Sequence, residues 1–313
     1  MKASSDKVNV YQIVTDRIIA ALEAGTIPWR KPWSVTGGGG SPRNHATGKA
    51  YRGVNWFMLQ MYGFESARWV TFKQAIDLGG NVRKGEKSAL VTFWKKWETK
   101  DKATGEEIKI PVLRYYNVFN LEQCDGIELP AAEKPALAQH QRIESAEAIV
   151  SGMASRPVLR HAGARAYYSP ALDSVTMPEM GRFTTAEDYY ATLFHELAHA
   201  TGHTSRLGRI KDSAAFGSEP YAQEELVAEM ASAFLCARCG IDAPIIENSA
   251  AYVDGWIKVL KGDSKLAIVA AAQAAKAADF ILGESFAEKV EEPAEAPAPV
   301  AEVVAPAGQL SLF

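Results

Sequence analysis

The chain has 313 residues, a formal net charge of −3, 47% hydrophobic residues and 23% charged residues, a length that allows two domains with cores of their own. No apolar run reaches the roughly 20 residues of a membrane span, and the opening MKASSDKVNVYQ lacks the apolar part of a signal peptide. The three cysteines are too few for a disulfide framework. We therefore expect a cytoplasmic protein with no membrane partner.

Charge is unevenly spread along the chain. Residues 1–130 hold 19 Lys and Arg against 13 Asp and Glu, and residues 131–283 hold 14 against 18. Residues 284–313 hold one lysine and six glutamates. A basic first part in an acidic protein indicates an anionic partner for that part alone.

Hydrophobic periodicity predicts an α+β fold of two domains, at residues 1–130 and 141–283, joined by a linker at 131–140. In the first domain we expect helices near 10–24, 54–61 and 71–78, followed by strands near 89–97 and 108–119. In the second we expect a helix near 142–153, strand-like RAYYSP and SVTMP, and helices near 185–201, 222–237 and 250–280, the last broken near Gly262. Residues 284–313 are rich in Pro, Ala and Glu and are predicted to be disordered.

The sequence FHELAHATGH predicts a metal-binding helix. His195 and His199 are four residues apart, so both imidazoles project from one helix face, and Glu196 can reach a water molecule at the same place. Tetrahedral Zn²⁺ needs a third protein ligand. A third histidine of the metzincin kind would fall at position 205, which is Ser205, so that interpretation fails.

A later helix offers a carboxylate instead. In YAQEELVAEMASAF, Glu225 and Glu229 are four apart, among small residues that let two helices approach closely. The pair resembles the gluzincin pattern, in which the first carboxylate binds the metal and the one four residues later orients a ligand histidine. That resemblance implies Glu225 as the ligand and Glu229 beside a histidine, with the reverse assignment as the alternative. Cys236 and Cys239 form a single C-x-x-C without a second pair, so packed thiols are favoured over ligands.

These residues predict zinc metallopeptidase chemistry. Zn²⁺ polarises a peptide carbonyl and lowers the pKa of a water, while Glu196 takes the proton and passes it to the leaving amine. The residue that stabilises the oxyanion is open among His203, Tyr221 and Tyr168. Because a fold can keep its metal after losing its substrate, proteolysis itself is a separate hypothesis.

Basic and aromatic residues interleave in the first part, in WRKPW, PRNHATGKAYRGVNW, NVRKGEK and FWKKW. Aromatic rings can stack on single-stranded bases while Lys and Arg neutralise phosphates, so this pattern favours single-stranded nucleic acid. Six of the seven tryptophans lie here, and we expect some of them, Trp69 and Trp94 among them, to serve the core.

Several longer stretches resemble the ArdC antirestriction family: PRNHATGKAYRGVN, WVTFKQAIDLGGNVRKGEK, YYNVFNLEQC, and HELAHATGH followed by YAQEELVAE. The resemblance covers about residues 8–283. It implies an N-terminal domain that binds single-stranded DNA, a C-terminal zincin-like metallopeptidase domain, and protection of incoming plasmid DNA from host restriction during conjugation. With the basic–aromatic pattern it implies these DNA contacts: Arg43, Asn44, Lys49, Tyr51, Arg52, Asn55, Arg83, Lys84, Lys87, Lys95 and Lys96.

The chain ends in QLSLF, which resembles the pentapeptide that binds the bacterial sliding clamp. In an extended peptide, Leu310, Leu312 and Phe313 could enter an apolar groove while Gln309 forms hydrogen bonds at its rim. The sequence therefore predicts the clamp as a second partner.

Three functions are compatible with these patterns. The first is a DNA-guided metallopeptidase that cleaves a protein of a restriction system. The second is a DNA-binding shield whose zinc domain is structural. The third is a peptidase that uses DNA only for localisation and is unrelated to restriction.

Overall fold

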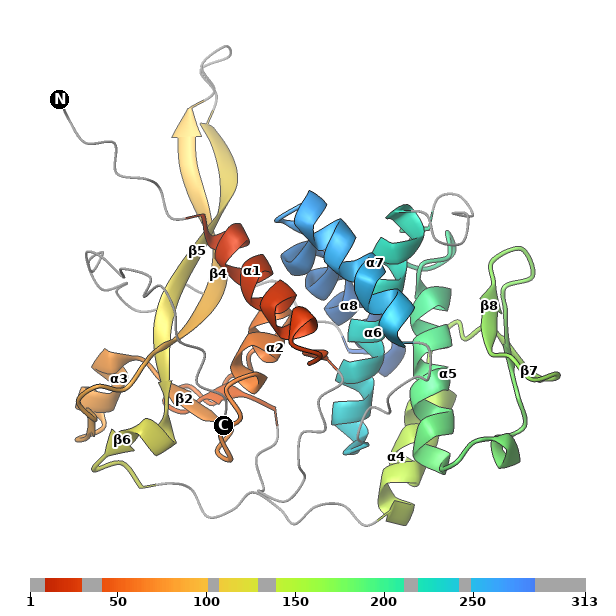
Figure 1. Ribbon diagram of the computed structural model, residues 1–313, viewed down its shortest axis with the longest axis horizontal. Helices are drawn as coiled ribbons and strands as arrows, with labels where there is room; N and C mark the ends of the chain where they lie inside the picture. Colours follow the sequence, from red (N-terminus) through yellow and green to blue (C-terminus); the bar gives the residue numbers. More distant parts are fainter. Residues whose placement is uncertain are drawn as a thin grey trace.

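The computed structural model of the protein describes residues 9–29, 41–100, 107–128, 139–210, 219–241 and 249–284. Its N-terminal part is built on a long twisted hairpin, and its C-terminal part is a group of helices with a small sheet at the far side (Figure 1). The predicted α+β fold of two domains is confirmed. The linker and the acidic tail lie largely or wholly outside the described residues, at 129–138 and 285–313.

The N-terminal part contains a four-stranded sheet in the order β1-β2-β5-β4. Strand β4 pairs antiparallel with β5 over the whole length of β4, from Ala89 opposite Val118 to Lys100 opposite Glu107. A second pair, β3 with β6, closes the far end, and helices α1, α2 and α3 complete this part. The elements are α1 (Val10–Glu23), β1 (Arg43–Asn44), α2 (Val54–Gln60), β2 (Arg68–Val70), α3 (Phe72–Asp77), β3 (Asn81–Val82), β4 (Ala89–Lys100), β5 (Glu107–Asn120) and β6 (Cys124–Asp125).

The C-terminal part packs five helices beside a three-stranded sheet in the order β7-β9-β8. Strand β9 is buried along its length and pairs parallel to β7 and antiparallel to β8. Sequence periodicity missed β7, most of whose residues are exposed. The elements are α4 (Gln139–Gly152), β7 (Val158–His161), β8 (Tyr167–Ser169), β9 (Ser174–Met177), α5 (Ala186–Thr201), α6 (Glu219–Cys239), α7 (Ser249–Gly262) and α8 (Leu266–Leu282).

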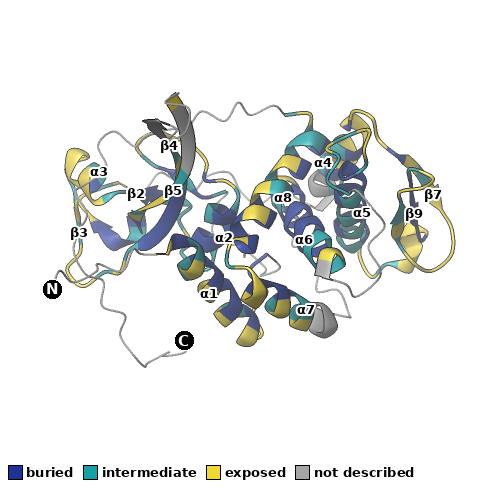
Figure 2. Ribbon diagram, turned by 90° about the horizontal axis from the view of Figure 1, so that it is seen from above, coloured by how far each residue is buried: buried dark blue, intermediate teal, exposed yellow. Residues whose placement is uncertain are grey.

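The largest hydrophobic core is shared by the two parts. It joins buried residues of α1 and α2 to buried residues of α6, α7 and α8, and Figures 1 and 2 place α1 and α2 between the N-terminal sheet and these helices. Aromatic rings form its centre: Trp29 lies 5.3 Å from Trp256, and Phe234 lies 4.8 Å from Phe57 and 5.4 Å from Trp56, measured between ring centroids. Such edge-on and tilted contacts add to the gain from burying apolar area.

Polar contacts cross the same boundary. The hydroxyl of Thr15, fully buried in α1, donates a hydrogen bond of 2.7 Å to the carbonyl of Ser264, and Arg52 forms an ion pair with Asp279 of α8. Each domain also has apolar clusters of its own. The two domains therefore share one continuous core in addition to their separate ones, which the sequence did not indicate.

The tryptophans divide between core and surface. Trp69 is buried as expected, but the expectation for Trp94 was wrong, because 40% of its surface is exposed. Trp94 lies on the outer part of the β4–β5 hairpin, where the ring of Tyr11 approaches it edge-on with its centroid 6.4 Å away. No helix among the described residues is both long and apolar enough to cross a membrane.

Candidate metal centre

Helix α5 begins at a well-formed cap. The hydroxyl of Thr185 accepts a hydrogen bond from the amide of Asp188, whose side chain accepts one in return from the Thr185 amide, so donors left over at the helix start are satisfied. One side of the helix is buried, with Leu193, Phe194 and Leu197 in a core of the C-terminal part and Ala198 in the core shared by the two parts. This burial fixes the rotation of the helix and hence the direction of His195 and His199.

Small residues bring α6 close to α5. Ala228 and Ala231 are fully buried, and the hydroxyl of Ser232 donates a hydrogen bond of 2.8 Å to the carbonyl of Ala191 in α5. A side chain that satisfies a backbone carbonyl of the neighbouring helix requires the two backbones to lie near each other. The close approach places the first half of α6 opposite the two histidines.

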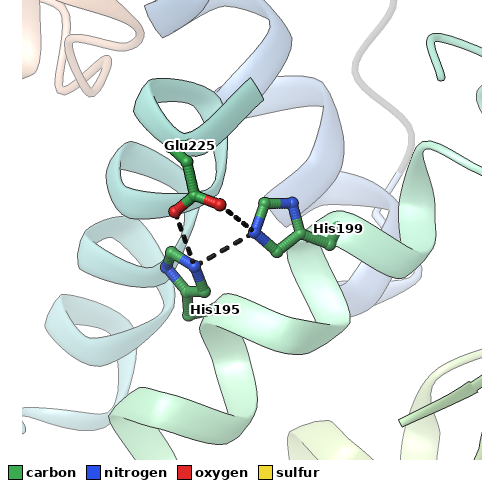
Figure 3. Close-up of side chains that lie close together, drawn as sticks. All are labelled: His195, His199 and Glu225. Carbon is green, nitrogen blue, oxygen red and sulfur yellow. Dashed lines mark hydrogen bonds and ion pairs between the residues drawn. The ribbon is translucent and has the colours of Figure 1, made fainter. Parts of the chain in front are cut away.

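Figure 3 shows the result: the Glu225 carboxylate from α6 faces both imidazoles from α5. The Nε2 atoms of His195 and His199 are 3.1 Å apart. Glu225 Oε2 is 3.4 Å from Nε2 of His195, and Oε1 is 3.4 Å from Nε2 of His199. One donor atom from each of the three residues therefore lies within 4.8 Å of the others, and two imidazole nitrogens with one carboxylate are a ligand set that suits Zn²⁺.

Other carboxylates face the opposite ring nitrogens. Glu229 Oε1 lies 3.6 Å from Nδ1 of His195, and Glu224 Oε1 lies 3.2 Å from Nδ1 of His199. The structure thus places Glu225, and not Glu229, on the side where the two Nε2 atoms converge. This favours Glu225 as the ligand and leaves Glu229 beside a ligand histidine.

Electrostatics at the site are dominated by these contacts. Burial alone would lower the pKa of His199, but its hydrogen bonds to Glu224 and Glu225 outweigh burial and hold that pKa well above its usual value. The pKa of His195 is raised more modestly, against burial, by Glu225 and by the charges of Glu229 and Glu196. Burial would raise the pKa of Glu225, but its hydrogen bonds to the two histidines lower it. These carboxylates therefore favour positive charge at the site, which protons on the histidines or a metal ion in their place can supply.

Glu196 lies between the two histidines in the chain and is 8% exposed. It is not part of the set of three donor atoms, and its charge acts on His195.

The segment after α5, residues 203–210, folds back over the end of the helix. The Ile210 amide donates to the carbonyl of Gly202, and a Cβ atom at Gly202 would lie 2.6 Å from the Ile210 side chain. Arg206, from the same segment, donates two hydrogen bonds of 2.8 and 3.0 Å to the carboxylate of Asp173.

The three candidates for an oxyanion partner differ in position. Tyr168 donates its hydroxyl to Asp173 at 2.9 Å, and burial together with that bond raises its pKa to about 12. His203 contacts Ser205 through Nδ1 at 2.7 Å, beyond the helix end. Tyr221 is half-buried on α6, one turn before Glu225, and of the three it is the one on the helix that carries a candidate ligand.

Comparisons with known proteins bear on both parts. The family described as the N-terminal domain of anti-restriction factor ArdC matches residues 8–119, and the zincin-like metallopeptidase family matches residues 144–274. The metal-free crystal structure of antirestriction ArdC from plasmid R388 is 42% identical, covering 87% of this chain and 96% of that chain, with a TM-score of 0.73. The chain belongs to the ArdC antirestriction family.

The further matches of this ArdC family member differ in how much of the matched protein they cover. The Mn(II)-bound structure of the R388 protein is 40% identical, with a TM-score of 0.72, over 88% of this chain and 97% of that chain. Protein y4eC of Sinorhizobium fredii (strain NBRC 101917 / NGR234) is 38% identical over 87% of this chain and 91% of its own length. Two DNA primases TraC of Escherichia coli are each 42% identical, but the match spans only 20% and 27% of their length.

Three of the predicted DNA contacts of this ArdC family member are used inside the fold. Asn44 is buried and donates to Gln74 at 2.9 Å, and Tyr51 is 8% exposed. The amide of Asn55 both donates to the carbonyl of Thr92 and accepts from its backbone N–H, each at 2.7 Å. Asn44 and Asn55 use polar atoms within the protein and Tyr51 is buried, so the part of these three residues in DNA binding stays a prediction.

Two predicted arginine contacts are held by acids: Arg52 by Asp279, and Arg83 by Glu86 at 2.8 Å. The other described candidates have exposed or half-exposed side chains, and they are Arg43, Lys49, Lys84, Lys87 and Lys95. The side chain of Lys96 lies outside the described part of the structure. Trp94 and Tyr115 add two aromatic rings, 40% and 39% exposed, on one face of the hairpin, because Thr92 and Trp94 share a face and Thr92 pairs with Tyr115.

Sequence reasoning missed two residues of the site. Glu224, beside the expected ligand in the chain, reaches the other side of His199, and Arg209 holds Glu224. The sequence feature that could have indicated Glu224 is the pair of adjacent glutamates. Two neighbouring positions on a helix can place Glu224 and Glu225 on opposite sides of one imidazole ring.

A direct comparison of Glu225→Gln with Glu229→Gln decides which carboxylate is the ligand. We expect Glu229→Gln to weaken Zn²⁺ binding by about 10- to 100-fold, as for loss of a group behind a ligand, and Glu225→Gln to weaken it further. Isothermal titration of the metal-free variants with Zn²⁺ measures both. A larger loss for Glu229→Gln would establish the reverse assignment.

Proposed function

We propose that this chain is a plasmid antirestriction protein that binds single-stranded DNA and carries a catalytic zinc centre of the metallopeptidase type. The observation that carries the second part of the proposal is the convergence of His195, His199 and Glu225, with Glu196 beside them. We place its action in the cytoplasm, where plasmid DNA arrives during conjugation.

The donor set decides which ion we propose. Two neutral imidazole nitrogens and one carboxylate suit Zn²⁺, and a site with three protein ligands leaves room for a substrate oxygen. When bound, such an ion would supply Lewis acidity toward a peptide carbonyl. The R388 ArdC protein has been crystallised with Mn(II) bound, so a divalent ion other than zinc is the alternative for this chain.

Glu196 supplies the proton transfer in this proposal. Its carboxylate is largely buried on helix α5 and is not one of the three proposed metal ligands, so it remains available to exchange protons. In peptide hydrolysis it would take a proton from the attacking water and deliver it to the departing amine nitrogen. The protein cut in this way would be a component of a host restriction system.

Single-stranded DNA binding rests on the N-terminal part. Exposed and half-exposed cationic side chains at Lys49, Lys84 and Lys87 can neutralise phosphates, and the exposed rings of Trp94 and Tyr115 can stack on bases. Stacking of this kind tolerates any base sequence, which suits a protein that protects DNA of unknown sequence.

Survival of unmodified plasmid DNA in a restricting host tests the catalytic part. We expect Glu196→Gln to abolish protection, because the amide cannot carry the proton, while metal content and single-strand binding stay unchanged. The matched control is Glu179→Gln, at an exposed glutamate before α5, which should protect like the wild type. Full protection by Glu196→Gln would instead support a DNA-binding shield with a structural metal domain.

Single-strand binding at several salt concentrations tests the DNA surface. Replacing Lys84 and Lys87 by Gln should weaken binding and reduce the slope of log affinity against log salt by about 0.7 for each phosphate that the variant no longer neutralises. The control exchange, at Lys258 and Lys276, removes the same charge from exposed positions on α7 and α8. Equal losses in the two double variants would show that net charge, and not this surface, determines binding.

We propose a further partner for the C-terminal QLSLF, which lies outside the described residues: the bacterial sliding clamp. The support is its sequence pattern alone, with Leu310, Leu312 and Phe313 as apolar anchors and Gln309 as the polar one. Clamp binding would hold the protein near newly replicated plasmid DNA.

Binding of a peptide of residues 284–313 to purified clamp measures this directly. Replacing Leu312 and Phe313 by Ala should reduce the affinity of the peptide for the clamp at least about 10-fold, since each substitution removes a large side chain from an apolar groove. Replacing Val303 and Val304 by Ala, in the same tract, should have no effect. Unchanged binding after loss of Leu312 and Phe313 would contradict the proposal.

A further inference from the structure

We propose that Glu224 and Arg209 act together as positioning residues for His199, forming a chain of contacts from the segment after α5 to the metal-binding nitrogen. The inference rests on the proposed metal centre. It concerns two residues that are not among the candidate ligands and do not face the converging Nε2 atoms.

Glu224 forms the contact with His199. Its Oε1 lies 3.2 Å from Nδ1 of His199, the ring nitrogen that faces away from Glu225. At that distance the carboxylate accepts a hydrogen bond from Nδ1–H, which leaves the lone pair on Nε2 and prevents the ring from turning over. His199 is thus presented to a metal in one tautomer and one orientation.

Arg209 in turn holds Glu224. Its guanidinium binds the carboxylate with two hydrogen bonds, Nη2 to Oε1 at 2.7 Å and Nε to Oε2 at 2.9 Å. It also donates to the Ala198 carbonyl at 2.6 Å and to the Thr201 hydroxyl at 2.7 Å, both in the last turns of α5. A planar fork that is bound on two sides leaves Glu224 little freedom.

The path of the chain brings Arg209 to this contact. Arg209 belongs to the segment that turns back at Gly202, where Ile210 packs into the space that a Cβ would need. The arginine is 11% exposed, so its charge is largely removed from water and is balanced at Glu224. Loss of either partner would leave a mostly buried charge without its counterion.

The two histidines are held differently. Nδ1 of His195 is buried and has no hydrogen-bond partner among the described residues, the Glu229 oxygen being 3.6 Å away. The corresponding nitrogen of His199 is within hydrogen-bonding distance of a carboxylate that is itself clamped. The geometry therefore makes His199 the ligand that is oriented in advance, and His195 the one that adjusts when metal binds.

Arg206 offers a matched control for the experiment. It lies in the same segment, its side chain is 2% exposed, and it binds the Asp173 carboxylate with a fork like that of Arg209. Asp173 lies in the turn between β8 and β9, so the Arg206 fork contacts no residue that binds a candidate metal ligand. Its removal should cost stability of the fold without loosening His199.

The test measures affinity for Zn²⁺ and, separately, for Mn²⁺ by titration of the full metal-free chain, together with thermal unfolding without metal. We expect Arg209→Met and Glu224→Gln each to lower metal affinity about 10- to 100-fold. The double variant should lose no more than the larger single loss, because both act through one contact. Arg209→Lys, which keeps the charge but not the fork, should recover part of the affinity, and Arg206→Met should lower the unfolding temperature at unchanged metal affinity.

The outcomes separate this inference from the function on which it rests. Failure of the wild-type chain to bind either ion would overturn the metal centre itself. Wild-type affinity in both Arg209→Met and Glu224→Gln, or an equal loss in Arg206→Met, would overturn the positioning role alone. If Arg209→Met does not fold, Glu224→Gln decides, since that substitution removes the charge that binds Arg209 and keeps the side-chain volume.

Discussion

The close approach of α5 and α6 is the constraint on which the site depends. A metal centre built from two helices needs their backbones near enough for a glutamate on one to reach imidazoles on the other. Small residues at Ala228 and Ala231 permit that distance, and the bond from Ser232 to the Ala191 carbonyl sets it. The carboxylate of Glu225 then falls opposite both histidines without any loop taking part, so the donors are fixed by rigid elements.

A second constraint ties the N-terminal part to this pair of helices. The ring of Phe234 belongs to α6, yet it packs on Trp56 and Phe57 of α2, so the helix that carries Glu225 is braced on its other side by the domain proposed to hold DNA. A packed aromatic cluster therefore connects the two parts for which the activities are proposed.

Local patterns carried much of the prediction. Helical spacing was enough to place His195 and His199 together, because four residues always make about one turn. The choice between Glu225 and Glu229 depended on how α6 is rotated, which is decided by tertiary packing. The same holds for Asn55 and Trp94. Asn55 forms hydrogen bonds to strand β4, and the ring of Trp94 is exposed to solvent. Both facts depend on tertiary packing and cannot be predicted from a single stretch of sequence. The shared core could not be predicted for the same reason, since the residues that meet in it are far apart in the sequence.

The large separation in sequence between partners in the shared core has a consequence for folding during synthesis. The hydrogen bond from Thr15 to Ser264 joins positions 249 residues apart. At ribosomal speeds of about 5–20 residues per second, α1 emerges roughly 10–50 s before the helix pair that covers its apolar face. During that interval Val14, Ile18 and Leu22 have no lasting partner in α7 or α8. The apolar face of α1 therefore stays without these partners until α7 and α8 have been synthesised.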